Sequence, residues 1–246
     1  MSKISDTKII RSETIEELLG KEEYLRIIEE ASGYADDIEN EFLFRTASIV
    51  IDGWHVRAKL TESGGNDSGE RLSDWLDRLG EWLSDRHEDR DNGLAMTAVA
   101  WDSHLADGQE KTKTFQSLHN KQKEKYLRSR SSNYVNQRSL WLSAEWNFSD
   151  LRQVGDHFIQ SGVDARMATS IIAAAYEKPN FLYVVTADQD FGPALKFASK
   201  LSQGTKIYLL TVGASVGDEL MEASDESWQI YPGYRAGGFA VSIPKN

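Results

Sequence analysis

The segment that most limits how this chain can fold is an apolar run at Phe181–Val185, which reads FLYVV. Its residues are β-branched, aromatic or leucine, and no polar residue alternates with them. A strand with one face in water shows such alternation, so this pattern predicts a strand buried on both faces. Strands of that kind lie in the middle of parallel sheets that are covered by helices on both sides. The sequence therefore predicts an α/β fold built around this strand.

Two carboxylates, Asp188 and Asp190, follow the predicted strand, and Phe191-Gly192-Pro193 then leads into a helical pattern. Helices cover the faces of an open parallel sheet, so the free crevice lies beyond the carboxyl ends of its strands. Two acids at that position are typical of a metal or phosphoryl-transfer site, but they are also typical of a turn that caps a helix. Both interpretations are open at this point.

Two other strand-like runs end in aspartate: residues 46–51 precede Asp52, and residues 94–101 precede Asp102. Carboxylates that converge without a cation repel one another and raise each other's pKa. A divalent ion such as Mg²⁺ removes that cost, because it takes oxygen ligands and keeps waters for substrate phosphates. The pattern therefore predicts an acidic, metal-binding edge of the sheet.

The composition limits the class of protein. A length of 246 residues suits one large domain, or one domain with an appendage. The absence of cysteine excludes disulfides and thiolate zinc sites. A formal net charge of -11 argues against nucleic-acid binding over the whole surface. The apolar runs are of strand length and the N-terminus has no signal-peptide core, so we expect a soluble, cytoplasmic protein without membrane contact.

Three regions are expected along the chain. Residues 1–45 combine a capping-box pattern with apolar stripes and many acids, which predicts an acidic helical appendage. This appendage could pack on the main domain, form a homodimer or protein-partner contact, or compete with a polyanionic substrate. Residues 46–232 form the predicted main domain, and residues 233–246 an extended C-terminal tail.

Within the main domain, the Gly- and Ser-rich segment 61–69 predicts a loop, and an apolar stripe over 72–83 predicts an amphipathic helix. We expect His87, in the charged run that follows, to be solvated. Further expected elements are strands over residues 140–146, 207–212 and 228–231, and helices over residues 164–176, 195–201 and 218–223.

One segment is strongly basic. Between Lys111 and Arg138 there are eight Lys or Arg residues against the single Glu124, with Phe115, Tyr126 and Tyr134 among them. Cations neutralise phosphates, and aromatic faces stack on unpaired bases. This pattern indicates nucleic-acid contact, although a solvated helix with a Lys-rich outer face is the alternative. The residues we expect to bind the nucleic-acid backbone are Lys121, Lys123, Lys125, Arg128 and Arg130.

Three blocks, taken together and in order, resemble the NYN domain, a branch of the PIN-like nucleases. They are Asp52-Gly53-Trp54-His55 after a strand, Gly162-Val163-Asp164 opening a helix, and Thr186-Ala187-Asp188-Gln189-Asp190-Phe191 after a strand. The segment from Gly217 to Trp228 is similar to the closing segment of the family. The resemblance covers roughly residues 45–232.

The resemblance implies a Rossmann-like (PIN-like) open, mainly parallel sheet and a Mg²⁺- or Mn²⁺-dependent endoribonuclease. By that implication Asp52, Asp164 and Asp188 bind the metal, with Asp190 beside them as a further catalytic acid. The implied mechanism is metal-assisted hydrolysis of an RNA phosphodiester bond without a covalent intermediate. No Gly-x-Ser-x-Gly, Gly-x-Gly-x-x-Gly or Walker pattern follows a strand, which argues against serine-hydrolase and nucleotide-cofactor chemistry.

The chain departs from the family at three positions. The family usually has Asn where this chain has His55, Lys where it has Ser161, and Asp where it has Ser170. His55 could bind a phosphate or a metal, or its ring could pack on the sheet. Ser170 could donate a hydrogen bond or hold a water, and Asp190 or Asp102 could supply the missing charge. The alternative to a ribonuclease is therefore a catalytically weak or inactive PIN-like module that binds RNA or a protein partner.

Two residues next to the predicted metal site allow two interpretations each. Thr186 could orient a metal-bound water or cap the turn after its strand. Trp54 could be a core residue or a surface on which a base stacks.

Overall fold

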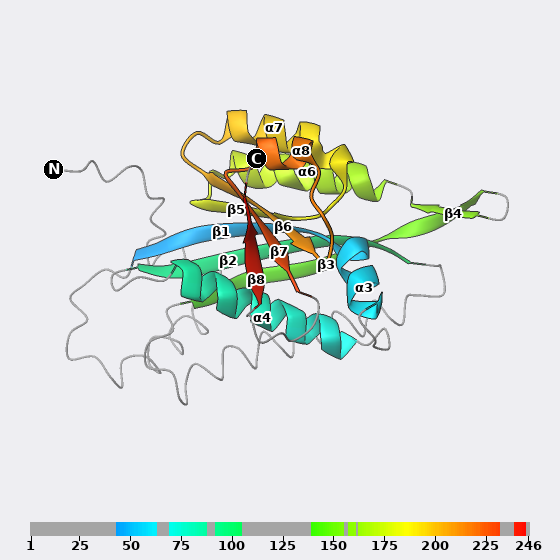
Figure 1. The fold of residues 1–246 in the computed structure, drawn as a ribbon, viewed down its shortest axis with the longest axis horizontal. Coiled ribbons are helices and arrows are strands. Elements are labelled where there is room, and N and C mark those ends of the chain that lie inside the picture. The colour runs from blue at the N-terminus through cyan, green and yellow to red at the C-terminus, as the bar shows by residue number, and fades with distance from the viewer. Residues whose placement is uncertain are drawn as a thin grey trace.

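A computed structural model describes residues 43–62, 69–87, 92–104, 139–154, 157–160, 162–231 and 239–244 of the chain. These residues form one eight-stranded sheet of order β4-β3-β2-β1-β5-β6-β7-β8 (Figure 1). The six inner strands are parallel, and β4 and β8 pair antiparallel at the two edges. The strands are β1 (Leu43–Asp52), β2 (Asn92–His104), β3 (Ser139–Val154), β4 (His157–Gln160), β5 (Phe181–Val185), β6 (Lys206–Val212), β7 (Glu226–Ile230) and β8 (Ala240–Ile243).

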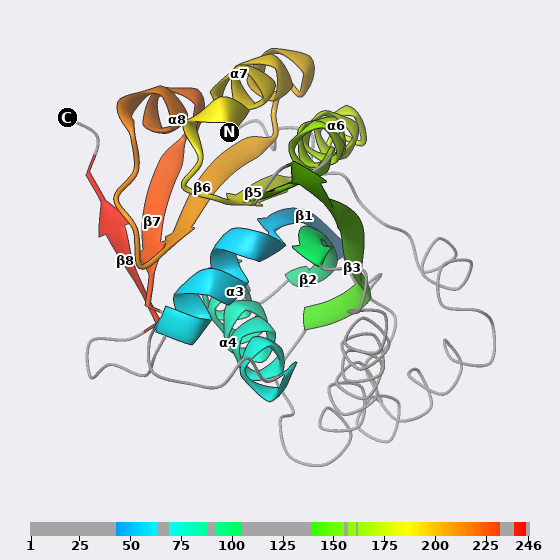
Figure 2. The same ribbon diagram turned by 90° about the vertical axis from the view of Figure 1, so that its right-hand side faces the viewer.

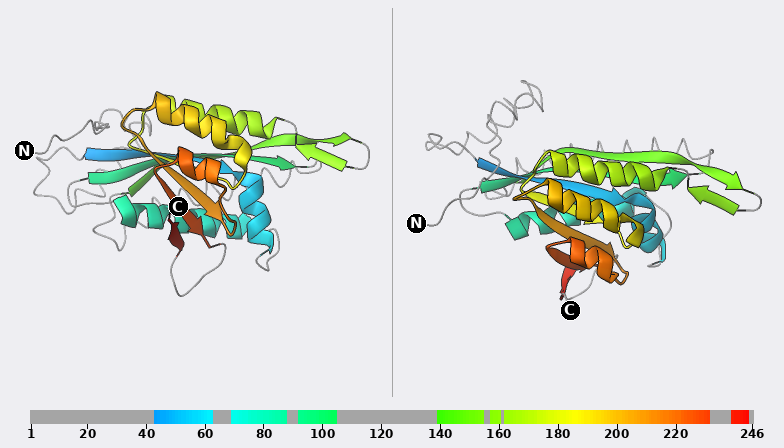
Figure 3. Two further views of the ribbon diagram at one scale, coloured as in Figure 1. Left: turned by 45° about the horizontal axis from the view of Figure 1, so that its top comes forward. Right: turned by 90° about the horizontal axis from the view of Figure 1, so that it is seen from above.

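Helices cover both faces of the sheet (Figure 3). Apolar side chains of α3 and α4 pack on one face, in a core with Ile49, Ile51 and Tyr183. Those of α6, α7 and α8 pack on the other, in a core with Val50 and Leu182. Successive residues of β1 and β5 thus alternate between the two cores, as a pleated strand requires. The described helices are α3 (Gly53–Glu62), α4 (Gly69–His87), α6 (Val163–Tyr176), α7 (Gly192–Leu201) and α8 (Asp218–Ala223), with a 3₁₀ turn η2 (Gln189–Phe191).

The order of the strands reverses between β1 and β5. From β1 the chain builds β2 and β3 on one side, and it then returns to β5 on the other side of β1 before adding β6 and β7. Figure 2 faces the carboxyl ends of these strands, with α6, α7 and α8 above the sheet and α3 and α4 below it. In open α/β sheets the crevice at such a reversal is where ligands bind.

The prediction of an α/β fold with a mainly parallel sheet is confirmed. All five side chains of β5 are buried, so the central strand has the two covered faces that its sequence indicated. β1 begins at Leu43, three residues before the predicted start of the main domain at residue 46. Residues 1–42, which carry most of the predicted helical appendage, lie outside the described residues.

Several elements were missed or misjudged. Helix α3 was not predicted. Its only buried apolar side chains are those of Val56 and Leu60, and two positions are too few to show an apolar stripe. Part of the predicted C-terminal tail, residues 240–243, is the edge strand β8 rather than a separate arm. No helix in the described ranges has the length and apolar character needed to cross a membrane.

The expectation that His87 is solvated was wrong. The last turn of α4 brings His87 onto the sheet, where it is 8% exposed. Its ring stacks on Phe181, with centroids 3.9 Å apart, and its Nε2 is hydrogen-bonded to the Tyr183 hydroxyl. Burial, followed by the charges of Arg86 and Arg45, lowers the pKa of His87 to about 3. The residue is therefore a neutral core histidine, because α4 extends to His87 and its last turn packs on the sheet.

Candidate functional site

Asp52, the last residue of β1, lies at the crevice where the strand order reverses. Strand alternation places it on the same face as Val50, which belongs to the core beneath α6. Its Oδ1 accepts a hydrogen bond of 2.9 Å from the backbone N–H of His55 in the first turn of α3. Its Oδ2 accepts one of 3.1 Å from the Thr186 hydroxyl. Both donors are neutral, and each oxygen of a carboxylate can accept a further partner.

Thr186 connects Asp52 to the segment that follows β5. Its side chain is fully buried, and its Oγ1 also accepts a hydrogen bond of 3.1 Å from the backbone N–H of Asp188. The Thr186 backbone N–H donates to the carbonyl oxygen of Leu210 on β6, at 2.9 Å. Thr186 therefore fixes the Asp52 carboxylate and the start of the Asp188 turn relative to one another. It caps the turn and orients a site acid at the same time.

The turn after β5 is held by Asp188. Its Oδ1 accepts a hydrogen bond of 3.0 Å from the backbone N–H of Asp190, which caps the 3₁₀ turn η2. The capping interpretation is thus confirmed for one oxygen. Within the described residues no hydrogen bond reaches Oδ2 of Asp188, and the residue is exposed. Capping therefore leaves a carboxylate oxygen at the crevice for another partner.

Asp164 reaches the same edge from the first turn of α6. Gly162 precedes this helix with a φ of 78°, in the left-handed region that favours glycine, and so turns the chain from β4 into α6. Because α6 runs back along the sheet, its N-terminus and Asp164 lie at the carboxyl edge of the strands (Figure 2). The sequence prediction that Asp52, Asp164 and Asp188 share one edge is consistent with the electrostatic coupling described next.

The carboxylates influence one another's protonation. The pKa of Asp52 is raised to about 6: burial has the largest effect, the negative charges of Asp188 and Asp102 add to it, and the hydrogen bonds from His55 and Thr186 oppose it. Burial also raises the pKa of Asp164, with the charges of Asp188 and Asp190 adding to the effect. Like charges close enough to act in this way are stabilised by a cation placed between them.

The acids at this edge do not form a closed metal site among the described residues. Among the described residues, no three Asp, Glu or His side chains are close enough to hold one ion, so the four aspartates do not form a complete cage. Mg²⁺, however, is usually held by one or two carboxylates and keeps several waters for substrate phosphates. Asp52 and Asp188 carry carboxylates of that type, and the Thr186 hydroxyl links the Asp52 carboxylate to the backbone N–H of Asp188. By their chemistry these oxygen donors suit a hydrated Mg²⁺ or Mn²⁺, whereas a metal stripped of water needs more ligands than the described residues bring together.

Asp102 has a different position from the one its sequence context suggested. Asp52 is paired with Trp101 in the β1–β2 register, so Asp102, one residue further, points to the opposite face. There it is fully buried and accepts two hydrogen bonds from Arg57 of α3, one of 2.8 Å from Nε and one of 3.0 Å from Nη2. It is paired with Arg57 on that face, and from there it does not replace the acid missing at Ser170. Sequence analysis also missed Arg57, because it missed α3.

The two residues that depart from the family pattern already have partners. The His55 Nε2 accepts a hydrogen bond of 3.4 Å from the backbone N–H of Val212, at the end of β6. Its ring thus packs on the edge of the sheet, and its link to Asp52 is through the backbone. The Ser170 hydroxyl accepts a hydrogen bond of 2.9 Å from the Trp101 indole N–H.

The basic residues predicted to bind RNA lie outside the described residues, as does Ser161. This applies to Lys121, Lys123, Lys125, Arg128 and Arg130.

Together, fold and site define an α/β protein with an open, mainly parallel sheet and with coupled carboxylates at the carboxyl edge of its strand reversal. No protein-family model and no curated protein matches the chain. A solved structure of a protein of unknown function from Vibrio parahaemolyticus is similar to it, with a TM-score of 0.45 and 13% identity over 80% of this chain and 96% of that one.

Proposed function

We propose that the chain is a Mg²⁺- or Mn²⁺-dependent ribonuclease with a PIN-like fold of the NYN kind, which hydrolyses RNA phosphodiester bonds at the Asp52–Asp188 crevice. The observation that supports this most is the state of Asp52. It is a half-buried carboxylate at the strand reversal, its donors are neutral, and its pKa is raised to about 6 by burial and by neighbouring negative charge. A bound divalent cation offsets both the burial of the Asp52 charge and its repulsion by the neighbouring acids.

The roles of the residues follow from their contacts. Asp52 and Asp188 would hold the ion, and Asp164 and Asp190 would add negative charge at the rim of the crevice. A bound divalent ion supplies a water of lowered pKa and neutralises charge on the phosphate. Thr186 keeps the Asp52 carboxylate in one orientation, and the Asp190 backbone N–H does the same for Asp188. These fixed orientations reduce the rearrangement required when ligand binds.

Purified protein incubated with labelled RNA and Mn²⁺, Mg²⁺ or EDTA tests the proposal. We expect metal-dependent fragments, and Asp188→Asn should reduce their rate by more than about 100-fold, because even the loss of an outer partner of a metal ligand costs 10–100-fold. Asp85→Asn is the matched control, since Asp85 is an exposed acid on α4. Undiminished Mn²⁺-dependent cleavage by Asp188→Asn would remove the assignment.

The contact with RNA is expected to extend to the basic segment. In a chain of net charge -11, eight cations between Lys111 and Arg138 support a backbone-holding role. Changing Lys121, Lys123 and Lys125 together to Glu should weaken RNA binding and flatten its dependence on salt, because fewer counterions are released. An unaltered salt slope would exclude this segment from the RNA contact.

A second candidate function is an RNA- or protein-binding module without catalysis. It is favoured by the lack of a complete three-ligand group among the described residues and by the engagement of Ser170 with Trp101. The same incubation discriminates the two, because a binding module retards labelled RNA on a gel yet gives no fragments with either metal.

A further inference from the structure

Trp54 is a large apolar side chain that the fold leaves in water. It is 42% exposed, and in the described part of the chain the other exposed large apolar side chains are Tyr176, Phe197 and Val241. Trp54 lies in the first turn of α3, two residues after Asp52. The indole thus presents an aromatic face to solvent at the start of the helix that follows the candidate site.

The indole is held in place by a cation. The guanidinium carbon of Arg57 lies 4.8 Å from the centre of the Trp54 ring, within the range of a cation–π contact. Arg57 is itself held by two hydrogen bonds to Asp102, which is fully buried. Arg57 therefore cannot leave the ring without breaking a buried ion pair, so the ring is supported by a fixed partner.

The backbone that carries Trp54 is also closely packed. A Cβ atom on Gly53 would lie 2.8 Å from the Trp146 ring and 2.9 Å from both the Asp102 Cβ and the Trp101 carbonyl oxygen. Glycine is needed here because the neighbouring strands approach the backbone so closely. The junction between β1 and α3 is thus pressed against β2 and β3, and it presents Trp54 from a rigid element.

We propose that the Trp54 indole, supported by Arg57, is a stacking platform for an unpaired nucleobase of the RNA strand that is cleaved at Asp52, two residues earlier in the chain. This inference rests on the proposed function and names its substrate as single-stranded RNA. Every base has a π face, so stacking on an aromatic side chain binds single strands with little sequence preference. A cation in contact with the same aromatic system strengthens such binding. A duplex, whose bases are stacked on one another, has no base to offer.

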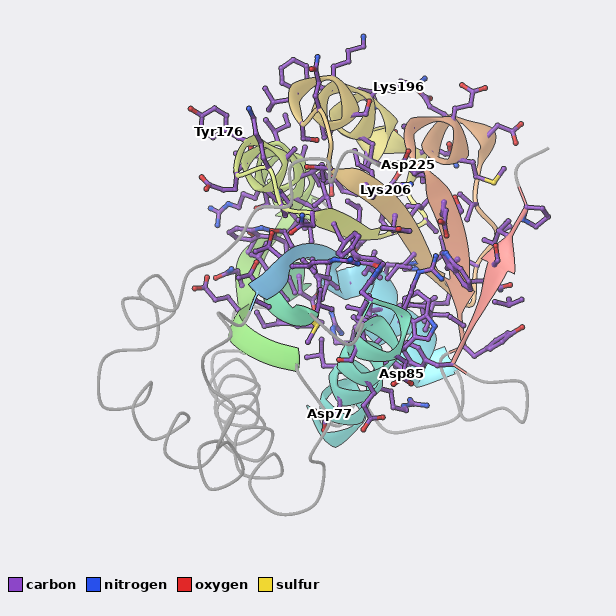
Figure 4. The ribbon with its side chains drawn as sticks, turned by 90° about the vertical axis from the view of Figure 1, so that its left-hand side faces the viewer. Asp77, Asp85, Tyr176, Lys196, Lys206 and Asp225 are labelled. Carbon is purple, nitrogen blue, oxygen red and sulfur yellow. The ribbon has the colours of Figure 1, made fainter. Side chains whose placement is uncertain are left out.

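The platform is tested by measuring binding of a fluorescein-labelled oligouridine to the full chain in EDTA, which prevents cleavage. Trp54→Ala should weaken binding between about 5-fold and 150-fold, the cost of losing one base–aromatic stack. Trp54→Phe should weaken the affinity less than Trp54→Ala does, because phenylalanine keeps an aromatic face. Tyr176→Ala is the matched control: Tyr176 is also exposed but lies at the other end of α6 (Figure 4), about 18 Å along the helix from Asp164.

A scan of single abasic sites along the oligonucleotide identifies the stacked base. In the wild-type protein one abasic position should weaken binding by about the same factor as Trp54→Ala, and in Trp54→Ala that position should have no further effect. If RNA binds but Trp54→Ala and Tyr176→Ala both behave as wild type, the platform is overturned and the proposed function stands. If the wild-type protein neither binds nor cleaves RNA, both are overturned. Unchanged thermal melting confirms that each variant is folded.

Discussion

Asp52 and Asp102 lie near the carboxyl ends of the neighbouring parallel strands β1 and β2, yet the fold treats them in opposite ways. Asp102 points to the α3 face, is fully buried, and is neutralised by two hydrogen bonds from Arg57. Asp52 points to the α6 face, is half-buried, and receives hydrogen bonds from neutral groups of His55 and Thr186. The two carboxylates differ by one position in the register between β1 and β2.

This difference separates a structural acid from a candidate functional one. A buried carboxylate with its own arginine has its charge balanced inside the chain. A carboxylate whose raised pKa follows from burial and from other acids carries an unbalanced charge, and an external cation can balance it. Four predictions compare the two acids, from the largest expected effect to the smallest.

Arg57→Met should be the most damaging change. It leaves the Asp102 charge buried without its partner, so the free energy of unfolding should fall by about 3–5 kcal/mol. Urea denaturation at pH 7 measures this. Adding Asp102→Asn to Arg57→Met should restore much of the loss, because no buried charge is then left. A loss in Arg57→Met no greater than that of an exposed ion pair, about 1 kcal/mol or less, would contradict the structural role assigned to the pair.

Mn²⁺ should stabilise the wild-type protein. At a free concentration 100 times its dissociation constant, a single-site ligand adds about 2.7 kcal/mol to the free energy of unfolding. The effect should be absent in Asp52→Asn and kept in the Arg57→Met, Asp102→Asn double variant. Because protons compete with the metal for Asp52, the stabilisation should appear as pH rises through about 6. Equal Mn²⁺ shifts of the melting temperature in Asp52→Asn and wild type would exclude Asp52 as a ligand.

Asp52→Asn without metal should make the protein more stable at neutral pH. The folded-state pKa of about 6 lies above the ordinary 3.8, so the native state binds more protons than the unfolded state between these values. Wild-type stability should accordingly fall as pH rises from about 4 through 6. Asp52→Asn does not undergo this loss. Its free energy of unfolding should therefore exceed that of the wild type by about 1–2 kcal/mol at pH 7 and equal it at pH 3.5. Denaturation in EDTA at the two pH values checks the sign, and a less stable variant at pH 7 would contradict it.

Thr186→Val should have the smallest effect. Valine keeps the shape of threonine but removes the hydrogen bond to Asp52 and the acceptor for the Asp188 backbone N–H. The loss should be about 1 kcal/mol of stability, and the pKa of Asp52 should rise because one of the hydrogen bonds that lower it is gone. Carboxyl ¹³C titration by NMR measures the pKa. If the Asp52 titration midpoint does not move upward, the hydroxyl does not hold this carboxylate.

Much of the fold was predictable from sequence because its strongest signals are local. The apolar runs of β1, β2, β5 and β6 and the apolar stripe of α4 each follow from a few consecutive residues. Helix α3 was not predictable in this way, since Val56 and Leu60 alone do not make a stripe. His87 was misjudged for a related reason: burial of a polar ring depends on Phe181 and Tyr183, which are far away in sequence.

The chain's own sequence determined that aspartates accompany the ends of apolar, strand-forming runs and that a doubly buried strand lies at the centre of a parallel sheet. These consequences of residue type and order nominated Asp52 and Asp188, and Asp164 was added by the resemblance to the NYN domain. Only the tertiary structure decided that Asp52 faces the crevice while Asp102 faces an arginine. The physical reason is the pleat of the sheet: a one-residue offset in register turns a side chain to the opposite face, and register is set by pairing between distant segments.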